Sequence, residues 1–402
     1  MKRIVLLIVL CIFATNAIAQ KKNECTENID FLIKTLEEKS PAYKNLIIDR
    51  KAFKLFVDDI KNEALNDDES NCSKYLQKIL RNVGDGHLQI LYNDNMGLKD
   101  SVSVKKFQES EKFNSLPRIN LENALVKNTA NKSLYYFLND DLSIYIIQED
   151  TKTFKGYVKE TNSIFWKPGE LILEYNKIDN GYEGVIYNRL KNPSYYKMDN
   201  LESLFKRFNV SKFPKQECGM FNQINEKLSY KIIDDVLYVS FRSFQNLTQE
   251  ENKEFESFIN SAVMPNYNKY KNIIFDVRDN YGGAMIYHSL TKFIRKDKSK
   301  KNIYVLQNRK TASAAELFIL QLKNIKDITT IGENTRGMVA FRDINVVEFP
   351  KKDYRLWLPT KIFDKNYKDL LKYEYFGIAP DIILQENQDW LSKTISVMKN
   401  SN

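Results

Sequence analysis

The fold of this chain is decided by Ile303-Tyr304-Val305-Leu306-Gln307-Asn308-Arg309-Lys310-Thr311-Ala312-Ser313-Ala314-Ala315-Glu316. The apolar run at 303–306 is typical of a buried strand, and from Ala314 onward apolar residues recur at helical spacing. Ser313 therefore stands where a strand leads into a helix, and two roles are open. As an N-cap, its side-chain oxygen would accept a backbone N–H. As a nucleophile, it would develop an oxyanion beside free N–H groups at the positive end of the helix dipole.

The same alternation of strand, loop and helix surrounds this stretch. Further strands are predicted at 272–277 and 328–331, and a helix is predicted at 284–294. Three strand-to-loop transitions in series predict a mostly parallel sheet with right-handed crossovers. In such sheets the functional loops follow the carboxyl ends of the strands.

A glycine pair, Gly282-Gly283, follows the strand at 272–277. It permits a turn with positive φ, or it brings a backbone N–H close to a substrate carbonyl as an oxyanion donor. In the second case the N–H of Ala314 supplies the other donor.

A nucleophilic serine needs a base, and the chain has two histidines. His288 falls within the predicted helix 284–294, where a surface or packing role is expected. His87 lies at a junction between a glycine-flanked loop and a strand, and it is the candidate base. With two histidines and no Cys-x-x-Cys pair, we expect neither a metal site nor a cofactor.

The first nineteen residues predict a secretory signal peptide, with Lys2-Arg3, an apolar run and a cleavage site after Ala19. The mature chain is therefore expected to be exported, periplasmic or extracellular, without stable membrane insertion. Its charges are interspersed, which argues against nucleic acid as a partner. The oligomeric state is left open. The predicted organisation is a signal peptide at 1–19, a helical region at 20–92, a connecting segment at 93–133, an accessory β module at 134–200 and a core domain at 229–395.

Two further features bear on this organisation. Three cysteines follow the signal peptide, and Cys25 and Cys72 are the natural disulfide pair because they flank one helical region, which leaves Cys218. The β module contains short strands, one of them at 163–166, separated by turn residues. We expect a self-contained antiparallel sheet there, with peptide binding by strand addition as the alternative.

Taken together, the motifs resemble those of the C-terminal-processing and tricorn-type serine peptidases, the tail-specific protease superfamily. The matching segments, in order, are Asp85-Gly86-His87, Asp276 to Gly283, Thr311 to Glu316, Gly332 to Gly337 and Gly377 to Asp381. The resemblance implies an α/β crotonase/ClpP-like core with Ser313 as nucleophile and oxyanion donors at Gly282, Gly283 and Ala314. It also implies an endopeptidase that hydrolyses peptides or proteins through an acyl-enzyme.

The departures from the family pattern indicate a branch. Members with a Ser/Lys dyad carry a lysine where this chain has Met338. The tricorn-like branch uses a histidine base, which falls on His87, and a glutamate, which falls on Glu374 and would hold the imidazolium. That branch also has a serine before the histidine, where this chain has Gly86.

Two competing interpretations remain. The chain could be a catalytically inactive homologue that binds peptides or hydrophobic ligands, or an adhesin or glycan binder built on the β module. A pure binding protein has no need of the combination of Ser313, His87 and Glu374, which favours the enzyme.

Overall fold

The computed structural model describes residues 23–92, 98, 100–127, 133–245, 248–351 and 354–400. The predicted signal peptide lies outside these residues. Within the described ranges, no helix is both long and apolar enough to cross a membrane.

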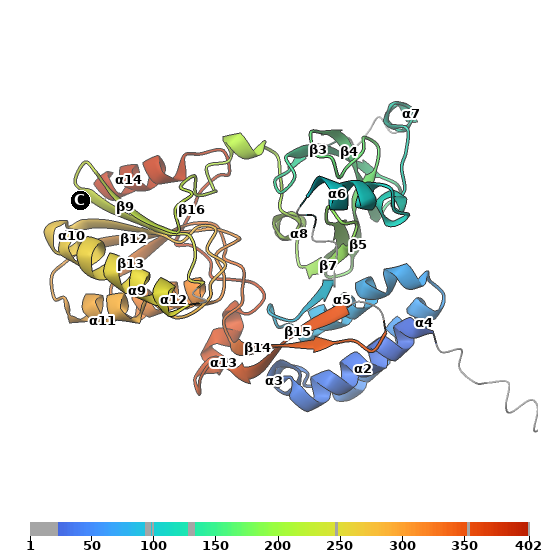
Figure 1. Ribbon diagram of the computed structural model, residues 1–402, viewed down its shortest axis with the longest axis horizontal. Coiled ribbons are helices and arrows are strands. Elements are labelled where there is room, and N and C mark those ends of the chain that lie inside the picture. Colours follow the sequence, from blue (N-terminus) through green and yellow to red (C-terminus); the bar gives the residue numbers. More distant parts are fainter. Residues whose placement is uncertain are drawn as a thin grey trace, which may run out of the picture.

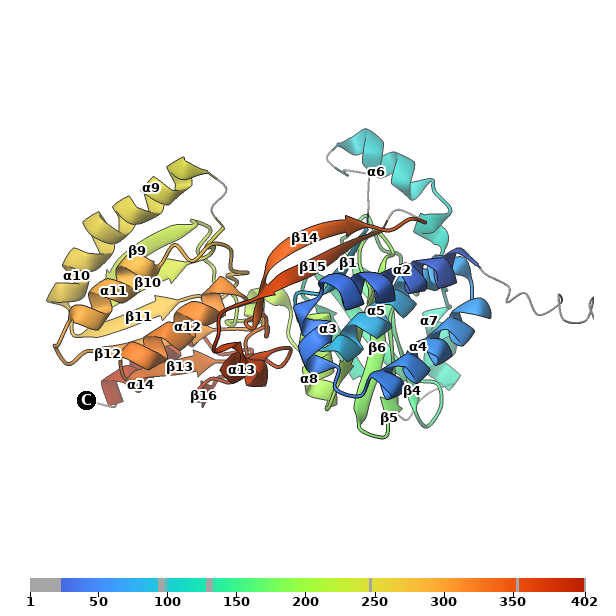
Figure 2. The ribbon, with the colours of Figure 1, turned by 90° about the horizontal axis from the view of Figure 1, so that it is seen from below.

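A six-stranded sheet contains the strand that precedes Ser313 (Figure 1). Its strand order is β16-β13-β12-β11-β10-β9, and only β9 runs antiparallel to its neighbour. The strands are β9 (Leu228–Ile233), β10 (Val236–Phe241), β11 (Asn272–Asp276), β12 (Asn302–Gln307), β13 (Ile328–Gly332) and β16 (Ile382–Ile383). The loops that follow the parallel strands face the rest of the molecule (Figure 2).

Helices cover both faces of this sheet, which is why β11 and β12 are nearly all apolar. Phe275 and Val305 point into one core, and Ile274 and Tyr304 point into the other. The first core packs against α9 (Gln249–Phe258), a π-helical turn (Ile259–Val263), α10 (Met264–Lys269), α11 (His288–Lys296) and α12 (Ala314–Ile325). The second packs against α14 (Trp390–Asn400).

One helix boundary differs from the prediction. The helix expected at 284–294 begins at His288. Gly282 and Gly283 both have positive φ, and the Ala284 N–H donates to the carbonyl of Phe244 at 2.9 Å. This bond holds residues 283 and 284 in an extended conformation beside Phe244, so the helix cannot begin there.

The N-terminal region is helical, as predicted, and the predicted disulfide between Cys25 and Cys72 is present. The helices are α2 (Glu24–Lys39), α3 (Pro41–Leu46), α4 (Arg50–Leu65) and α5 (Cys72–Val83). Side chains of Asn23, Ser40 and Asp49 cap the first three, as expected of Asn, Ser and Asp at that position.

These helices share their core with a distant part of the chain. A three-stranded antiparallel sheet, β1-β15-β14, packs on them, with Leu356 and Leu358 buried beside Leu32 and Leu76. The strands are β1 (Gln89–Tyr92), β14 (Phe341–Glu348) and β15 (Tyr354–Ile362), and the short helix α13 (Tyr367–Leu370) follows. The hairpin β14–β15 therefore completes a core that begins about three hundred residues earlier.

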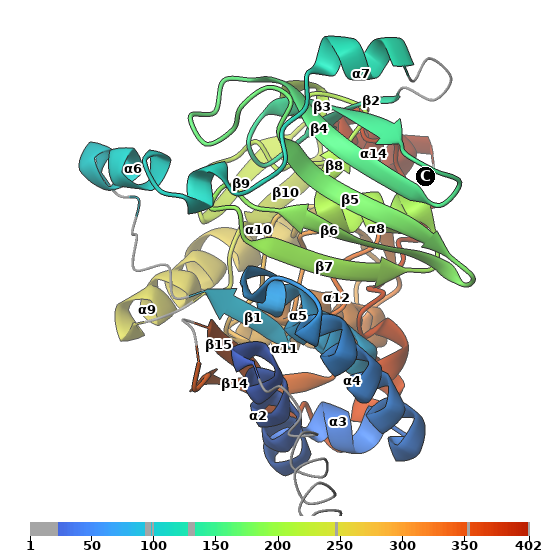
Figure 3. The same ribbon diagram turned by 90° about the vertical axis from the view of Figure 1, so that its right-hand side faces the viewer.

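A seven-stranded antiparallel sheet forms the third part (Figure 3). It consists of β2 (Ser133–Phe137), β3 (Leu142–Gln148), β4 (Thr153–Thr161), β5 (Leu171–Ile178), β6 (Gly181–Tyr187), β7 (Pro193–Met198) and β8 (Val210–Ser211), accompanied by α6 (Ser101–Gln108), α7 (Leu121–Lys127) and α8 (Leu201–Phe208). The strand predicted at 163–166 is wrong, since these residues form a turn between β4 and β5. Trp166 is buried there, and its Nε1 donates to Asp140 at 2.9 Å. The apolar pattern at 163–166 therefore arises from the buried Trp166 side chain and not from a strand.

The architecture is thus a mixed α/β fold with a helical N-terminus, as predicted. The expectation of a mostly parallel sheet does not hold for the molecule as a whole. Of the three sheets in the described residues, two are antiparallel throughout, and parallel strands pair in the sheet around β12.

Helix α5 joins the N-terminal helices to the edge strand β7. The Gln77 side chain binds the backbone of β7 in the way that a neighbouring strand would. Its Nε2 donates to Pro193 O at 2.7 Å, and its Oε1 accepts the Tyr195 N–H at 2.9 Å. Because α5 leads directly to Asp85-Gly86-His87, this contact helps to fix where that motif lies.

The disulfide can be tested by unfolding. Replacing both Cys25 and Cys72 by serine should lower the free energy of unfolding in urea by about 2–4 kcal/mol, because the unfolded chain loses a covalent constraint. Adding a reductant should bring the wild-type protein to the same value and leave the double variant unchanged. Equal stabilities without reductant would contradict a formed disulfide.

Candidate functional site

Ser313 lies between β12 and α12 in a backbone conformation that is rare for a residue with a side chain. Its φ is 52° and its ψ is −118°. Such strain persists only where the surroundings enforce it, and it is common at functional sites. Ser313 occupies the N-cap position of α12 and forms a capping box with Glu316. Its hydroxyl also faces His87, with 3.4 Å between Ser313 Oγ and His87 Nε2.

The buried carboxylate of Glu316 enforces this conformation. It accepts hydrogen bonds from the Ser313 N–H at 2.8 Å, the Gly337 N–H at 2.7 Å, the Met338 N–H at 2.9 Å and the Thr335 hydroxyl at 2.5 Å. Burial raises the pKa of Glu316, although these hydrogen bonds act in the opposite direction. Glu316 thus connects the serine to the loop after β13. The sequence analysis assigned it no role.

The glycine turn lies directly against the serine. A Cβ on Gly282 would come within 2.8 Å of Ser313 Cβ and 2.9 Å of Ala314 N. Only glycine permits this approach, and its φ of 88° requires glycine as well. The Gly282 N–H donates to Asn280 Oδ1 at 2.9 Å. The Gly283 and Ala314 N–H groups donate to no protein acceptor among the described residues.

His87 reaches Ser313 from the end of α5. The helix ends at Gly84, which is in the left-handed conformation, and the chain then turns tightly. The His87 N–H donates to Asp85 Oδ1 at 2.8 Å, which fixes this turn. The structure thus brings together the two predicted residues Ser313 and His87, which are 226 positions apart.

The carboxylate of Asp85 faces the His87 imidazole from the side away from Ser313. Among the described residues, it is the carboxylate that forms an ion pair with His87. Its Oδ1 lies 3.6 Å from His87 Nδ1, which is an ion-pair contact and longer than a hydrogen bond. Both His87 Nδ1 and Asp85 Oδ2 are buried without a hydrogen-bond partner in the described part of the chain. Burial lowers the pKa of His87, but Asp85, with smaller contributions from Glu374 and Glu316, outweighs it and raises the pKa. Asp85 belongs to the Asp85-Gly86-His87 motif, but its role was not predicted from the sequence.

Glu374 lies in the same site, but its hydrogen bonds go to the backbone. Its Oε1 accepts the Gly86 N–H at 2.8 Å, and its Oε2 accepts the N–H groups of Val339 and Ala340 at 2.9 and 2.7 Å. Burial and the charge of Asp85 raise the pKa of Glu374 to about 7. Glu374 therefore holds the backbone beside His87 together, and its charge acts on the imidazole from a distance.

The two departures from the family pattern have structural reasons. A Cβ on Gly86 would lie 2.2 Å from the carbonyl oxygen of Gly337 and 2.9 Å from Met338 Cγ. There is no room for a serine before His87, because the Met338 loop fills that space. Met338 contributes its backbone N–H to Glu316, so its position matters even without a lysine side chain.

Asp85, His87 and Glu374 also offer ligand atoms within 4.8 Å of one another, a spacing that would suit a metal ion. Both oxygens of Glu374 already accept backbone N–H groups, however, and Asp85 Oδ1 accepts that of His87. The arrangement suits proton transfer better, because His87 Nε2 faces a hydroxyl.

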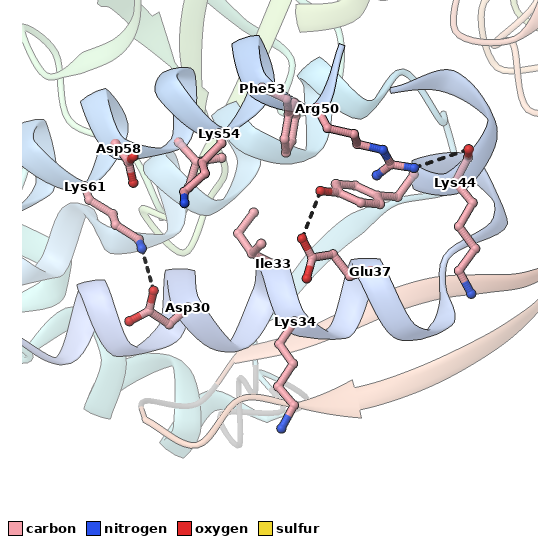
Figure 4. Close-up of a pocket in the computed structure, with 12 residues that line it drawn as sticks. Asp30, Ile33, Lys34, Glu37, Lys44, Arg50, Phe53, Lys54, Asp58 and Lys61 are labelled. Carbon is pink, nitrogen blue, oxygen red and sulfur yellow. Dashed lines mark hydrogen bonds and ion pairs between the residues drawn. The ribbon is translucent and has the colours of Figure 1, made fainter. Parts of the chain in front are cut away.

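The second histidine and the hollow between α2 and α4 lie apart from the Ser313 site. His288 is exposed at the start of α11. A hollow of about 640 Å³ lies between α2 and α4 (Figure 4), and some of its charged side chains are already bound to other lining residues. Lys61 pairs with Asp30 at 2.5 Å, and the Tyr43 hydroxyl donates to Glu37 at 3.2 Å. This hollow is the seam between two amphipathic helices.

Comparison with known proteins agrees with this geometry. Residues 288–384 match the sequence profile of Peptidase family S41. This segment is that of a serine peptidase. The match confirms the predicted resemblance and the predicted enzyme class, a serine-type peptidase, and it does not distinguish the branches. It includes Ser313, Glu316 and Glu374 but not His87. No curated protein matches the chain.

Several solved S41-type structures are similar at low identity. Mature CPAF has a TM-score of 0.45 and 10% identity over 93% of this chain and 97% of its own. The photosystem II D1 C-terminal processing protease has a TM-score of 0.38 and 13% identity over 94% and 97%. The tricorn protease has a TM-score of 0.39 and 11% identity over 94% and 37%. At these values the likenesses carry no argument of their own.

The role of Glu316 can be tested by Glu316→Gln. The amide keeps the size of the side chain but turns one acceptor into a donor that faces N–H groups, so the free energy of unfolding should fall by about 1–3 kcal/mol. Urea unfolding measures this. The exposed Glu254→Gln on α9 is the matched control and should change stability by less than about 0.5 kcal/mol. Equal effects of the two substitutions would contradict the structural role of Glu316.

Proposed function

We propose that this serine peptidase is an exported endopeptidase that uses Ser313 as nucleophile and His87 as base. The observation that carries the proposal is the 3.4 Å approach of Ser313 Oγ to His87 Nε2 at a serine held in a strained backbone conformation. A catalytic hydrogen bond of this length without substrate is common, because it shortens when the substrate binds.

In the first step Ser313 Oγ attacks the scissile carbonyl carbon while His87 Nε2 takes the hydroxyl proton. The Gly283 and Ala314 N–H groups receive the oxyanion, because neither donates to an acceptor in the described part of the chain and the glycine turn lies against Ser313. The role of Gly282 is to allow this approach, since its own N–H is bound to Asn280. His87 then protonates the leaving amine, and the acyl-enzyme remains. Water, deprotonated by His87, hydrolyses the ester and releases the acid.

Two carboxylates support the imidazolium that forms. Asp85 faces Nδ1 and favours the tautomer in which Nδ1 carries the proton and Nε2 accepts one. Glu374 contributes its charge and holds Gly86 in place, so its proposed role is indirect. The predicted role of Glu374 in stabilising the imidazolium is therefore proposed as an indirect one, through its charge and its hydrogen bond to Gly86.

The remaining predictions complete the proposal. We propose a crotonase-like core at 229–395, with the helical region, connecting segment and β module at the predicted boundaries. Export rests on the signal sequence at 1–19, and peptides or proteins are the proposed substrates. No observation favours the inactive homologue over the enzyme, since the Ser313 and His87 side chains face each other.

The nucleophile is tested by Ser313→Ala and His87→Ala. Each should lower peptide hydrolysis by at least about 10³-fold and leave the unfolding temperature nearly unchanged. A fluorophosphonate probe should label the mature wild-type protein at Ser313, as read by peptide mass spectrometry. The exposed Ser261→Ala on the π-helical turn serves as control and should keep full activity and labelling. Undiminished turnover in the Ser313 variant would refute the proposal.

The role of Asp85 is tested by pH dependence. Hydrolysis needs neutral His87, so activity should rise with pH through a pKa that Asp85 holds above the ordinary value. Asp85→Asn removes a negative charge beside the imidazolium, so the pKa of His87 should fall and the midpoint should move to lower pH, along with a loss of turnover. Imidazole NMR titration reads the same pKa directly, and His288→Gln assigns the two histidines. A midpoint that stays in place would exclude this role for Asp85.

A further inference from the structure

Three arginines from separate parts of the chain gather beside the candidate site. Arg81 comes from α5, Arg207 from α8 and Arg336 from the loop after β13; we call them the arginine cluster. The helices α5 and α8 both contact β7, and the three elements lie side by side in Figure 1. The Cζ atoms of Arg81 and Arg336 lie 5.1 and 6.0 Å from the ring centre of Tyr196 on β7.

The arginine cluster has aromatic and backbone neighbours. Arg336 Nη2 donates to the Tyr196 hydroxyl at 3.4 Å, and Arg207 Nη2 donates to the carbonyl oxygen of Tyr375. The Cζ of Arg207 also lies 5.1 Å from the ring centre of Tyr375. A guanidinium has five N–H groups. In the described contacts, Arg207 and Arg336 each use one side-chain N–H group, so most of their donors are available.

No member of the arginine cluster forms an ion pair with a described carboxylate, in contrast to other buried arginines of the chain. Arg278 pairs with Asp276 at 2.6 Å, and Arg309 pairs with Glu333 at 2.8 Å and Glu386 at 2.6 Å. Buried charge is normally paired in this way, because an uncompensated charge away from water is costly. The arginine cluster is half-buried, and its three positive charges have no described carboxylate within ion-pair distance.

The pKa values reflect this excess of positive charge. Burial alone would raise the pKa of Tyr196, yet the three guanidinium groups lower it below its ordinary value. Burial and the neighbouring charge of Arg336 lower the pKa of Arg207 to about 10. Both shifts have the direction expected of a site that favours a negative charge.

The arginine cluster is attached to the catalytic segments themselves. The Arg336 N–H donates to the carbonyl of Thr311, two residues before Ser313, at 2.8 Å. Arg81 Nη1 donates to the carbonyl of Leu88, the residue after His87, at 3.4 Å. The charge of Arg336 also acts on Tyr281, which is exposed and precedes the glycine turn. Arg336 is therefore anchored to the segment that carries Ser313, and its charge reaches the residue before the glycine turn.

We propose that the arginine cluster binds the carboxylate of an aspartate or glutamate side chain of the peptide substrate, at a position next to the scissile bond. The planar guanidinium matches a carboxylate with two parallel hydrogen bonds, and Tyr196 and Tyr375 hold Arg336 and Arg207 in place. The inference rests on the proposed peptidase function and specifies its substrate class as acidic peptides. A side chain fits better than a chain terminus, because an endopeptidase substrate continues on both sides of the bond that is cut.

The experiment measures binding in the Ser313→Ala variant, where no turnover interferes. The probes are fluorescent decapeptides, blocked at both ends, that carry one glutamate at successive positions, each with a glutamine counterpart. At one position the glutamate peptide should bind at least about tenfold more tightly, as expected when charged hydrogen bonds are gained. Adding Arg336→Gln or Arg207→Gln should abolish this preference, and Arg336→Lys should retain part of it. The exposed Arg295→Gln on α11 is the matched control and should leave it intact.

The inference would be overturned if no position showed a preference for glutamate, or if a preference survived Arg336→Gln in a protein with unchanged unfolding temperature. A companion set of glutamine decapeptides with a free C-terminus tests the other anion. Tight binding of this set but not of its blocked counterparts would also overturn the inference, because the anion would then be a terminus. Fluorophosphonate labelling of the wild-type protein separates this inference from the proposed function. Labelling without a glutamate preference refutes the acidic site alone, and a glutamate preference without labelling refutes the nucleophile.

Discussion

The buried carboxylate of Glu316 is the interaction on which the candidate site depends. It is fully enclosed, and it is stable there because four donors surround it. One of these donors belongs to Ser313, and the others belong to the loop after β13. A single side chain at the start of α12 thus sets the serine conformation and the path of the neighbouring loop. That loop in turn fills the space against Gly86, so the position of His87 also follows from it.

The site unites three parts of the molecule through backbone hydrogen bonds to carboxylates. Glu316 binds the loop after β13, Glu374 binds Gly86 and the start of β14, and Asp85 binds the turn that carries His87. The same three carboxylates surround the imidazole with negative charge, which raises its pKa. Structural and electrostatic roles therefore coincide, and a substitution at any of the three changes both.

The sequence was sufficient for the local features and insufficient for the contacts between distant segments. The Gly282-Gly283 turn, the strand before Ser313 and the helix after it follow from short-range patterns, and so does the Cys25–Cys72 pair. The pairing of His87 with Ser313 was predicted from the choice between two histidines and from the family resemblance, because no local pattern links residues so far apart. The roles of Glu316 and Asp85 were missed, although both lie within quoted motifs, because a buried carboxylate reveals its partners only in three dimensions. The strand predicted at 163–166 failed for a related reason, since a buried Trp166 produces an apolar pattern without a strand.

The hairpin β14–β15 has a consequence for the order in which the chain acquires activity. The N-terminal helices bury their apolar faces against Leu356 and Leu358, so their core stays incomplete until most of the polypeptide has been made. His87 sits at the end of one of these helices, and Glu374 binds beside it only after the hairpin is in place. Contacts of such long sequence separation form late and slowly in folding. A growing chain therefore lacks an assembled site until the hairpin and the segment that carries Glu374 have been made.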